Sequence, residues 1–344
     1  MFQTSDDAAM KFLENTTIMP QKNRGSVIAI GNFDGVHRGH LAVLSAAQKI
    51  ANEINAPYGA LTFDPHPRHF LRPQLAHFCL TPLALKVKLM EALGLDVLIA
   101  APFNQELAAM SARQFVQEIL VENLKVSHVV TGENFYFGKG REGDISTLKT
   151  LGAELGFGVE AIQQVLGDDK QAFSSTAVRE YLKEGNMRSA AEILGHWWQV
   201  MGPVVEGDKR GRTIGFPTAN IKLEADVNPK FGVYVVRARV VDDKSDGKIG
   251  PIISGVANLG LRPTFARDNA VLEVNLFDFE ADIYGQTLLV DVISFLRPEQ
   301  KFDGLEALKK QISQDAHAAK AILADLQKQG DPMETYPIGK YFAS

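Results

Sequence analysis

The feature that most constrains the fold is a short apolar strand followed at once by a glycine-rich turn and an amphipathic helix. Val27–Ile30 is an unbroken apolar run of strand length, typical of a buried strand. Val43, Ala47, Ile50 and Ile54 then recur at helical spacing, so they form one apolar face of a helix. A buried strand that leads directly into a helix is the unit from which parallel α/β sheets are built.

Short apolar runs continue to alternate with helical patterns as far as about residue 155. Further strands are predicted at residues 61–63, 97–100 and 126–131. Thr81 and Pro82 predict the start of one helix and Gly94 its end, and a capping box of Ser111 and Gln114 predicts another. Two more helices are predicted at residues 176–184 and 187–194. The N-terminal half is therefore expected to be a Rossmann-like parallel sheet flanked by helices.

The periodicity changes near His196, where we expect a domain boundary. From Gln199 to about Phe295 the chain shows period-2 patterning punctuated by Gly and Pro, with strands such as residues 233–236 and 272–277. This pattern predicts an antiparallel β-barrel domain.

A terminal helix follows the predicted barrel. Asp303 is its expected cap and Glu306 the capping-box partner, while Leu305, Leu308 and Ile312 form an apolar stripe. The expected domains are residues 1–195 and 196–330, followed by a tail of residues 331–344.

Composition fixes the broad class of protein. The chain has 344 residues, and its 45% hydrophobic and 22% charged residues are typical of a globular protein with two domains. No apolar run approaches the roughly 18 residues of a membrane span, and the N-terminal residues carry no export or import pattern. The single cysteine, Cys79, fits a reducing compartment, so a cytoplasmic protein is expected. The net charge of −5 argues against a general nucleic-acid coat.

The turn after the first strand reads GNFDGVHRGH from Gly31 to His40. Its glycines let the backbone approach a ligand closely, and the helix N-terminus presents N–H groups and a positive dipole to phosphate. His37 and His40 are three residues apart, so both can face one ligand and donate hydrogen bonds to oxyanions during phosphate substitution. The turn therefore predicts a phosphate site suited to nucleotidyl transfer.

The alternative is a plain glycine-rich turn in which one histidine is a surface residue and the other a helix cap. For an isolated H-x-G-H pattern the two interpretations have about even weight. Ligands of open α/β sheets bind at the carboxyl ends of strands, and this position favours a site. The turn matches neither G-x-G-x-x-G nor a Walker A sequence, which disfavours a dinucleotide oxidoreductase or a P-loop enzyme.

The turn resembles that of nucleotidyltransferases with H-x-G-H motifs, and in its full wording that of the bacterial bifunctional riboflavin kinase/FAD synthetase family. Three further segments carry the resemblance: TFDPHP at residues 62–67, GENFYFG at residues 132–138 and SSTAVR at residues 174–179. Each follows a predicted strand or opens a predicted helix. The resemblance covers nearly the whole chain, without the first 25 residues and the tail after about residue 326.

The resemblance implies a set of nucleotide-binding residues in the N-terminal domain. The set comprises Gly31, Asn32, Phe33, Gly35, Gly132 and Asn134 for nucleotide or FMN, Ser174, Ser175 and Thr176 for the ATP phosphates, and Arg179 to neutralise their charge. Taken singly, Asn134 could be a turn residue, Ser175 a plain N-cap and Arg179 a solvated helix residue. Related chains often carry a basic residue before Ser-Ser-Thr, whereas Gln171-Ala172-Phe173 stands here.

In the β domain, residues 207–220 read GDKRGRTIGFPTAN and resemble the riboflavin kinase signature. The glycines permit a tight loop over phosphates, while Thr218 and Asn220 offer oxygen ligands of the kind that Mg²⁺ accepts. The segment therefore predicts a MgATP site, to which Gly211, Arg212, Gly215, Phe216 and Pro217 also contribute. The alternative is that residues 215–217 form only a hairpin turn.

Glu273 is selected by resemblance alone, because an isolated Glu on a strand is usually exposed. In the family it is the candidate base that takes the proton from the riboflavin 5′-hydroxyl as that oxygen attacks the γ-phosphate. Related chains often have His where Asn275 stands. Glu306 could contact the flavin or only cap the last helix.

The resemblance implies two successive reactions: riboflavin and ATP give FMN and ADP in the C-terminal domain, and FMN and ATP give FAD and pyrophosphate in the N-terminal domain. The expected partners are riboflavin, FMN, ATP and Mg²⁺, without nucleic acid or membrane, and the expected state is a monomer or weak oligomer. One alternative is a nucleotidyltransferase for another phosphorylated metabolite, which Thr218, Asn220 and Glu273 together oppose. Another is a flavin-binding protein without catalysis.

Overall fold

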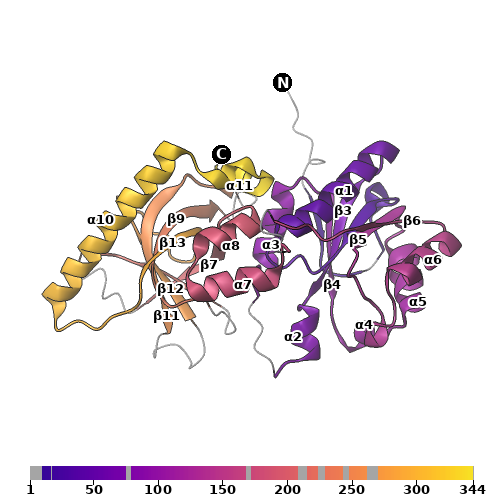
Figure 1. The fold of residues 1–344 in the computed structure, drawn as a ribbon, viewed down its shortest axis with the longest axis horizontal. Helices are drawn as coiled ribbons and strands as arrows, with labels where there is room; N and C mark the ends of the chain where they lie inside the picture. Colours follow the sequence, from indigo (N-terminus) through magenta and orange to yellow (C-terminus); the bar gives the residue numbers. More distant parts are fainter. Residues whose placement is uncertain are drawn as a thin grey trace. The chain divides into compact units, whose positions relative to one another are not determined.

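The structure is a computed structural model that describes residues 10–16, 18–74, 79–167, 172–207, 215–223, 229–242, 248–261 and 270–343. The chain forms two compact units, Met1–His77 with Pro82–Ser174 and Phe78–Thr81 with Ser175–Ser344. This division differs from the boundary expected near His196. The helices α7 (Ser175–Glu184) and α8 (Met187–Leu194) join the second unit because α8 packs on its strands β7 and β13 (Figure 1).

The first unit contains the predicted parallel sheet. Its strands are β1 (Lys11–Leu13), β2 (Val27–Ile30), β3 (Tyr58–Asp64), β4 (Val97–Pro102), β5 (His128–Gly132) and β6 (Gly158–Ile162), in the order β1-β4-β3-β2-β5-β6 with every pairing parallel. The prediction had no strand at β1 or β6. Both are edge strands whose described residues are only half-buried or exposed, so they lack the apolar signal of the central strands.

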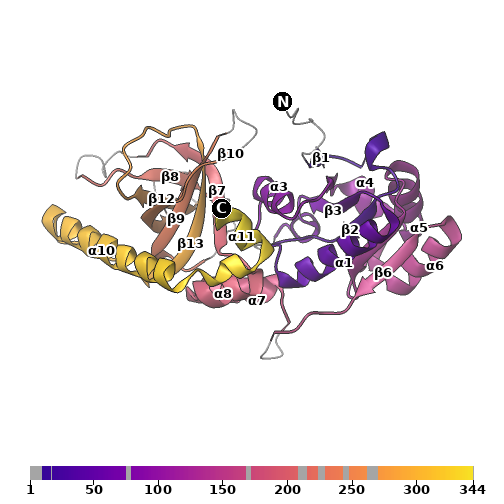
Figure 2. The same cartoon turned by 90° about the horizontal axis from the view of Figure 1, so that it is seen from above.

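Helices cover both faces of this sheet, as its all-buried central strand β2 requires (Figure 2). The elements are α1 (Arg38–Ile54), α2 (Pro67–Leu71), α3 (Leu83–Ala92), α4 (Gln105–Ala109), α5 (Ala112–Gln114), the π-helical segment Phe115–Asn123 and α6 (Ile145–Leu155). Helix α1 packs on β2, β3 and β5, while apolar residues of the π-helical segment and α6 share a core with β2 and β4. The capping box of Ser111 and Gln114 is confirmed. The predicted cap at Thr81 is wrong, because Pro82 is the N-cap of α3 and no side chain caps it.

The strand order reverses between β2 and β5, because successive strands are added first on one side of β2 and then on the other. From β2 the sheet extends through β3 to β4 on one side, and then through β5 to β6 on the other. Ile30 pairs with Thr131, and the Thr131 hydroxyl donates a hydrogen bond of 3.2 Å to the Ile30 carbonyl. Gly31 and Gly132 therefore leave the sheet side by side, at the kind of crevice where open α/β sheets bind ligands.

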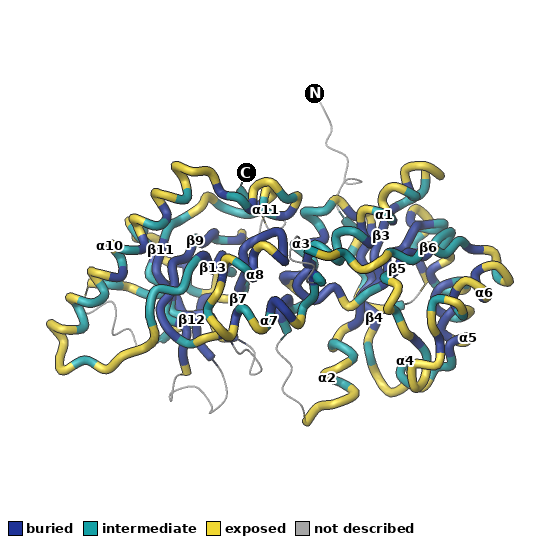
Figure 3. The backbone as a smooth tube through the Cα atoms, viewed as in Figure 1, coloured by how far each residue is buried: buried dark blue, intermediate teal, exposed yellow. Residues whose placement is uncertain are grey.

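The second unit contains the predicted antiparallel barrel. Its strands are β7 (Trp198–Val205), β8 (Ala219–Lys222), β9 (Gly232–Asp242), β10 (Lys248–Ile249), β11 (Ile253–Leu261), β12 (Ala270–Leu276) and β13 (Thr287–Arg297). Six of them follow the order β9-β11-β12-β8-β7-β13, and the pairing of β13 with β9 closes the ring, while β10 pairs with the end of β9. The closed barrel buries apolar residues of both long strands, β9 and β13 (Figure 3).

The predicted terminal helix is α10 (Leu305–Gln329), which packs along β9 and β11 (Figure 1). Ala319 and Leu323 join a core that includes Val233 and Val256. The predicted capping box of Asp303 and Glu306 is wrong: the N-cap is Gly304 and no side chain caps the helix. The chain enters the helix at Gly304 with φ at 152°, a conformation open to glycine and costly for other residues.

A network of buried charges attaches the C-terminal segment, Pro332–Thr335 and α11 (Pro337–Ala343), to the barrel. Asp331 accepts hydrogen bonds from the Trp197 indole at 2.9 Å and from the Arg237 guanidinium at 2.6 Å. Arg239 lies 2.9 Å from Asp291 and also donates to the carbonyl of Phe342. Each of these charges is at least partly buried, so the partners are needed to offset the loss of hydration.

Removing the carboxylate of Asp331 should destabilise the second unit. Asp331→Ala leaves the Trp197 N–H and one side of Arg237 without their acceptor, and we expect a loss of about 3 kcal/mol in the free energy of unfolding. Denaturant unfolding measures this loss. Asp325→Ala, which removes an exposed carboxylate that bonds Gln329 on α10, is the matched control and should change the stability by less than about 0.5 kcal/mol. Equal stability of the two variants would contradict the prediction.

Candidate active sites

The first candidate site is the turn between β2 and α1. Phe33 and Val36 have φ angles of 46° and 43°, and both side chains are fully buried. Positive φ is unfavourable for a non-glycine residue and most of all for a β-branched one such as Val36. Strained backbone of this kind is concentrated at ligand sites, because the surrounding structure must hold it in place.

The two histidines of the turn lie against each other. His37 is the N-cap of α1, and its Nδ1 accepts the backbone N–H of His40 at 3.3 Å. The two rings stack with their centroids 3.6 Å apart. The structure thus brings together the two histidines predicted to face one ligand. His40 Nδ1 is buried and makes no hydrogen bond with the described residues.

The pKa of His40 is well below its usual value. Burial is the main cause, because it disfavours the charged imidazolium, and the nearby His37 and Lys86 act in the same direction. His40 is therefore neutral at neutral pH in the ligand-free protein. A neutral ring can donate one hydrogen bond to phosphate.

Lys86 belongs to this site and was missed by the sequence analysis. It lies on α3 with only 5% of its surface exposed. Its Nζ donates to the Asn32 carbonyl at 2.8 Å and to the Thr62 hydroxyl at 3.1 Å. A sequence signal existed, because Lys86 stands three and four residues before the buried Leu89 and Met90 and so shares their helix face.

The segment after β5 starts at the same sheet edge as the histidine turn. Gly132 is the last residue of β5, and its carbonyl accepts the N–H of Phe135 at 3.1 Å, which makes residues 132–135 a turn. A side chain added at Gly132 would meet no described atom within 4 Å, so there is open space in front of this strand end. Asn134 is exposed.

Along the sequence, the chain passes from the first compact unit to the second within the Ser-Ser-Thr segment. Ser174 is the last residue of the first unit, and Ser175, Thr176 and Arg179 belong to α7 of the second. The residue before them, Phe173, is anchored in the first unit, where the Arg38 guanidinium lies 4.3 Å from its ring centroid. A basic residue from the histidine turn therefore stands beside the position where related chains often carry one, and Gln171 lies outside the described residues.

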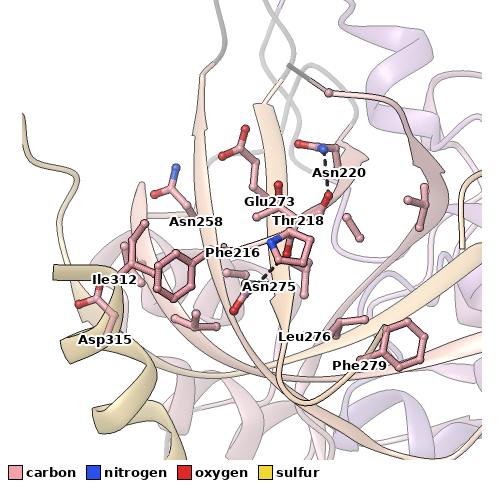
Figure 4. A pocket seen from close by; sticks show the side chains of 18 of the residues that line it. Phe216, Thr218, Asn220, Asn258, Glu273, Asn275, Leu276, Phe279, Ile312 and Asp315 are labelled. Atoms are coloured by element: carbon pink, nitrogen blue, oxygen red, sulfur yellow. Dashed lines mark hydrogen bonds between the residues drawn. The ribbon is translucent and has the colours of Figure 1, made fainter. Parts of the chain in front are cut away.

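The second candidate site is a cavity of about 850 Å³ in the second unit, lined by residues of the barrel and of α10 (Figure 4). Glu273 on β12 pairs directly with Asn258 on β11 and with Asn220 on β8. Directly paired residues of neighbouring strands project to the same face. The three polar side chains thus form one row that lines the cavity, and Glu273 is not the exposed carboxylate that an isolated strand Glu usually is.

The predicted phosphate and metal residues line the same cavity. Phe216, Pro217, Thr218 and Asn220 are among its lining residues, and the Asn220 amide bonds the Thr218 carbonyl at 3.5 Å. A side chain at Gly207 would come within 2.5 Å of the Asn220 amide, so this glycine leaves room for it. Gly215 precedes Phe216 with φ at 89°. Gly211 and Arg212 lie outside the described residues.

Asn275 has a structural partner in this loop. Its amide nitrogen donates to the Pro217 carbonyl at 2.7 Å, so it ties the loop that carries Thr218 to strand β12. The cavity is also lined by the Arg297–Asp315 ion pair, at 2.6 Å, which joins β13 to α10. Glu306 is not brought to the cavity: it is exposed and pairs with Lys309 at 3.3 Å.

Comparison with known proteins matches two family models to consecutive parts of the chain, in the same order as the two compact units. The family model described as FAD synthetase matches residues 19–177, and the riboflavin kinase model matches residues 194–323. The bifunctional riboflavin kinase/FMN adenylyltransferase of Escherichia coli strain K12 is 39% identical over 308 residues, which is 90% of this chain and 95% of that protein.

The chain belongs to the bifunctional riboflavin kinase/FMN adenylyltransferase family. The Bacillus subtilis member is 36% identical over 318 residues, which cover 90% of this chain and 96% of that protein. A Streptococcus pneumoniae crystal structure named macrolide-efflux protein has a TM-score of 0.75 at 28% identity and covers 91% of this chain and 99% of its own. Within the described residues, no helix has the length and apolar character to cross a membrane.

The bond from Asn275 to Pro217 should matter for FMN formation only. Asn275→Leu keeps a similar size but removes the hydrogen bond, so we expect a roughly tenfold lower kcat/KM for riboflavin phosphorylation, which corresponds to about 1.4 kcal/mol. Asn275→His, which keeps a ring N–H donor at the position where related chains often have His, is the control and should retain most of the activity. Product chromatography from riboflavin and MgATP measures both rates. Equal rates for the Leu and His variants would contradict this role.

Proposed function

We infer that this chain makes FMN and then FAD. The second unit transfers the γ-phosphoryl group of ATP to the riboflavin 5′-hydroxyl and releases ADP. The first unit joins the FMN phosphate to the α-phosphorus of a second ATP and releases pyrophosphate. The observation that carries this conclusion is that one chain matches the FAD synthetase and riboflavin kinase families over consecutive segments and along nearly the full length of a bifunctional relative.

We propose that Glu273 is the base of the kinase reaction. Its carboxylate stands in the polar row between Asn258 and Asn220, with the Thr218 loop beside it. As the riboflavin 5′-oxygen bonds to the γ-phosphorus and the bond to ADP breaks, the hydroxyl proton would pass to this carboxylate. The row supports the proposal because it places a carboxylate next to the predicted phosphate residues.

Mg²⁺ fits the donors of this site. The Thr218 hydroxyl and the Asn220 amide oxygen are hard oxygen ligands, and Mg²⁺ commonly takes one or two such protein ligands while phosphates and water supply the rest. Among the described residues there is no group of three His, Cys, Asp or Glu that could hold a metal ion, so the proposed ion depends on ATP for its other ligands. When bound, it would neutralise charge on the β- and γ-phosphates.

For the adenylylation reaction we propose that His37 and His40 donate hydrogen bonds to the reacting phosphates. Because His37 Nδ1 accepts the His40 N–H, a neutral His37 carries its proton on Nε2, which is then a donor. The attacking group is already an ionised phosphate, so no base is needed. Gly31, Asn32, Phe33, Gly35, Gly132 and Asn134 would contact nucleotide or FMN, with Ser174, Ser175, Thr176 and Arg179 on the ATP phosphates.

The proposed partners are small molecules, namely riboflavin, FMN and MgATP. All described residues that line the kinase cavity come from one compact unit, so a monomer suffices for that reaction. We propose a cytoplasmic location, where ATP is available and the lone Cys79 would stay reduced.

The two activities should be separable by mutation. Glu273→Ala should lower the rate of FMN formation by about 10²-fold or more, which is the usual size of general-base catalysis. It should leave the rate of FMN adenylylation unchanged. The double change His37→Ala with His40→Ala should do the reverse. Chromatography of products from riboflavin or FMN with MgATP measures both. If either variant lost both activities while keeping its fold by circular dichroism, the assignment of one reaction to each unit would be refuted.

A further inference from the structure

Lys86 places a buried ammonium group next to the histidine turn. Lysine is almost never buried unless its charge is paired, because an ammonium loses much hydration energy on burial. Here 5% of the residue is exposed, and its Nζ bonds the Asn32 carbonyl at 2.8 Å and the Thr62 hydroxyl at 3.1 Å. The packing of α3 alone gives no reason for a charge at this position, since Leu85, Leu89 and Met90 around it are apolar.

The bonds of Lys86 fix the orientation of one peptide group in the turn. The Thr62 hydroxyl accepts from Lys86 and donates to the same Asn32 carbonyl at 3.0 Å. In a trans peptide the C=O and N–H point in opposite directions, so holding the Asn32 carbonyl also aims the N–H of Phe33. Within the described residues, that N–H has no hydrogen-bond acceptor, although Phe33 is 1% exposed. A buried donor of this kind calls for a partner.

Lys86 also contributes to the charge state of His40. Burial is the main cause that disfavours a proton on His40, and the stacked His37 and the Lys86 ammonium act in the same direction. The buried Nδ1 of His40 has no partner among the described atoms. The remaining ionisable groups of the turn are Asp34, which is buried, and Arg38, which is half-buried and lies over Phe173. An incoming polyphosphate would therefore meet the Lys86 ammonium close to a His40 ring that is held neutral.

We propose that Lys86 is a positioning residue for adenylyl transfer: its ammonium aims the Phe33 N–H at a phosphoryl oxygen and supplies a fixed positive charge beneath the turn. The inference rests on the proposed function of the first unit. The ligand class that this arrangement recognises is a polyphosphate, here the phosphates of ATP, because it offers both an acceptor for the N–H and a negative charge for the ammonium.

Two variants separate the anchoring of the turn from the charge. Lys86→Met keeps the unbranched apolar stem and removes the ammonium. Thr62→Val keeps the shape of Thr62 and removes only its hydroxyl, so the ammonium and its bond to Asn32 remain. The kcat and KM for FAD formation from FMN and MgATP are measured from pH 5 to 9, with FMN formation from riboflavin in the same chain as the control.

Lys86→Met should lower kcat for FAD formation about 10²-fold, the size of losing one oxyanion-type group, whereas Thr62→Val should lower it about tenfold. Since Lys86 lowers the pKa of His40, its removal should move the apparent pKa of the pH–rate profile upward, and Thr62→Val should leave that pKa in place. FMN formation should be unchanged in both. This pattern would support the proposal.

The proposal is overturned if Lys86→Met forms FAD at a rate within twofold of that of the unmodified chain. It is also overturned if both variants lose FAD formation equally and keep the same apparent pKa, because Lys86 would then act only as a core residue. If Lys86→Met does not fold, the Thr62→Val variant tests the proposal instead. An unchanged rate of FAD formation in Thr62→Val would show that holding the Asn32 carbonyl has no role, and would overturn the proposal. Absence of FAD from the unmodified chain would instead refute the proposed function itself.

Discussion

The parallel pairing of β2 with β5 is the constraint on which the first site depends. This pairing brings Ile30 and Thr131 into register, so the chain leaves the sheet at Gly31 and at Gly132 side by side. Because β3 and β5 occupy both sides of β2, the strained turn that follows β2 lies at this edge of the sheet. The helix α1, the histidine pair at its start and the buried lysine below them all take their positions from that edge.

In the barrel, strand register determines which site residues lie together, as strand order does in the parallel sheet. Asn220, Glu273 and Asn258 are far apart in sequence, and only the pairing of β8, β12 and β11 puts them in one row. A shift of one residue in β12 would turn Glu273 to the other face and bring Val274 in its place. The polar row is therefore a property of the register of these three strands.

Sequence reasoning worked where the signal was local. The turn from Gly31 to His40 follows directly from a strand, a set of glycines and a helix start, and the structure places it as expected. It failed for Lys86, because the partners of its ammonium come from the turn after β2 and from β3, and a single charge in an apolar helix pattern is only a weak signal. It also gave a wrong cap at Asp303, since the chain enters α10 through Gly304 in a conformation no pattern of polar residues encodes.

The charge network around Asp331 has a consequence for synthesis of the chain. Trp197 lies at the start of the barrel unit and Asp331 near the end of the chain, 134 residues later, yet they share a buried hydrogen bond. Arg237 and Arg239 are translated well before Asp331 and Phe342. On a growing chain, Arg237 therefore lacks the Asp331 carboxylate and Arg239 lacks the Phe342 carbonyl until those residues have been synthesised. The first unit can fold while translation continues, whereas the second can complete its folding only after the segment from Asp331 to Phe342 has been synthesised.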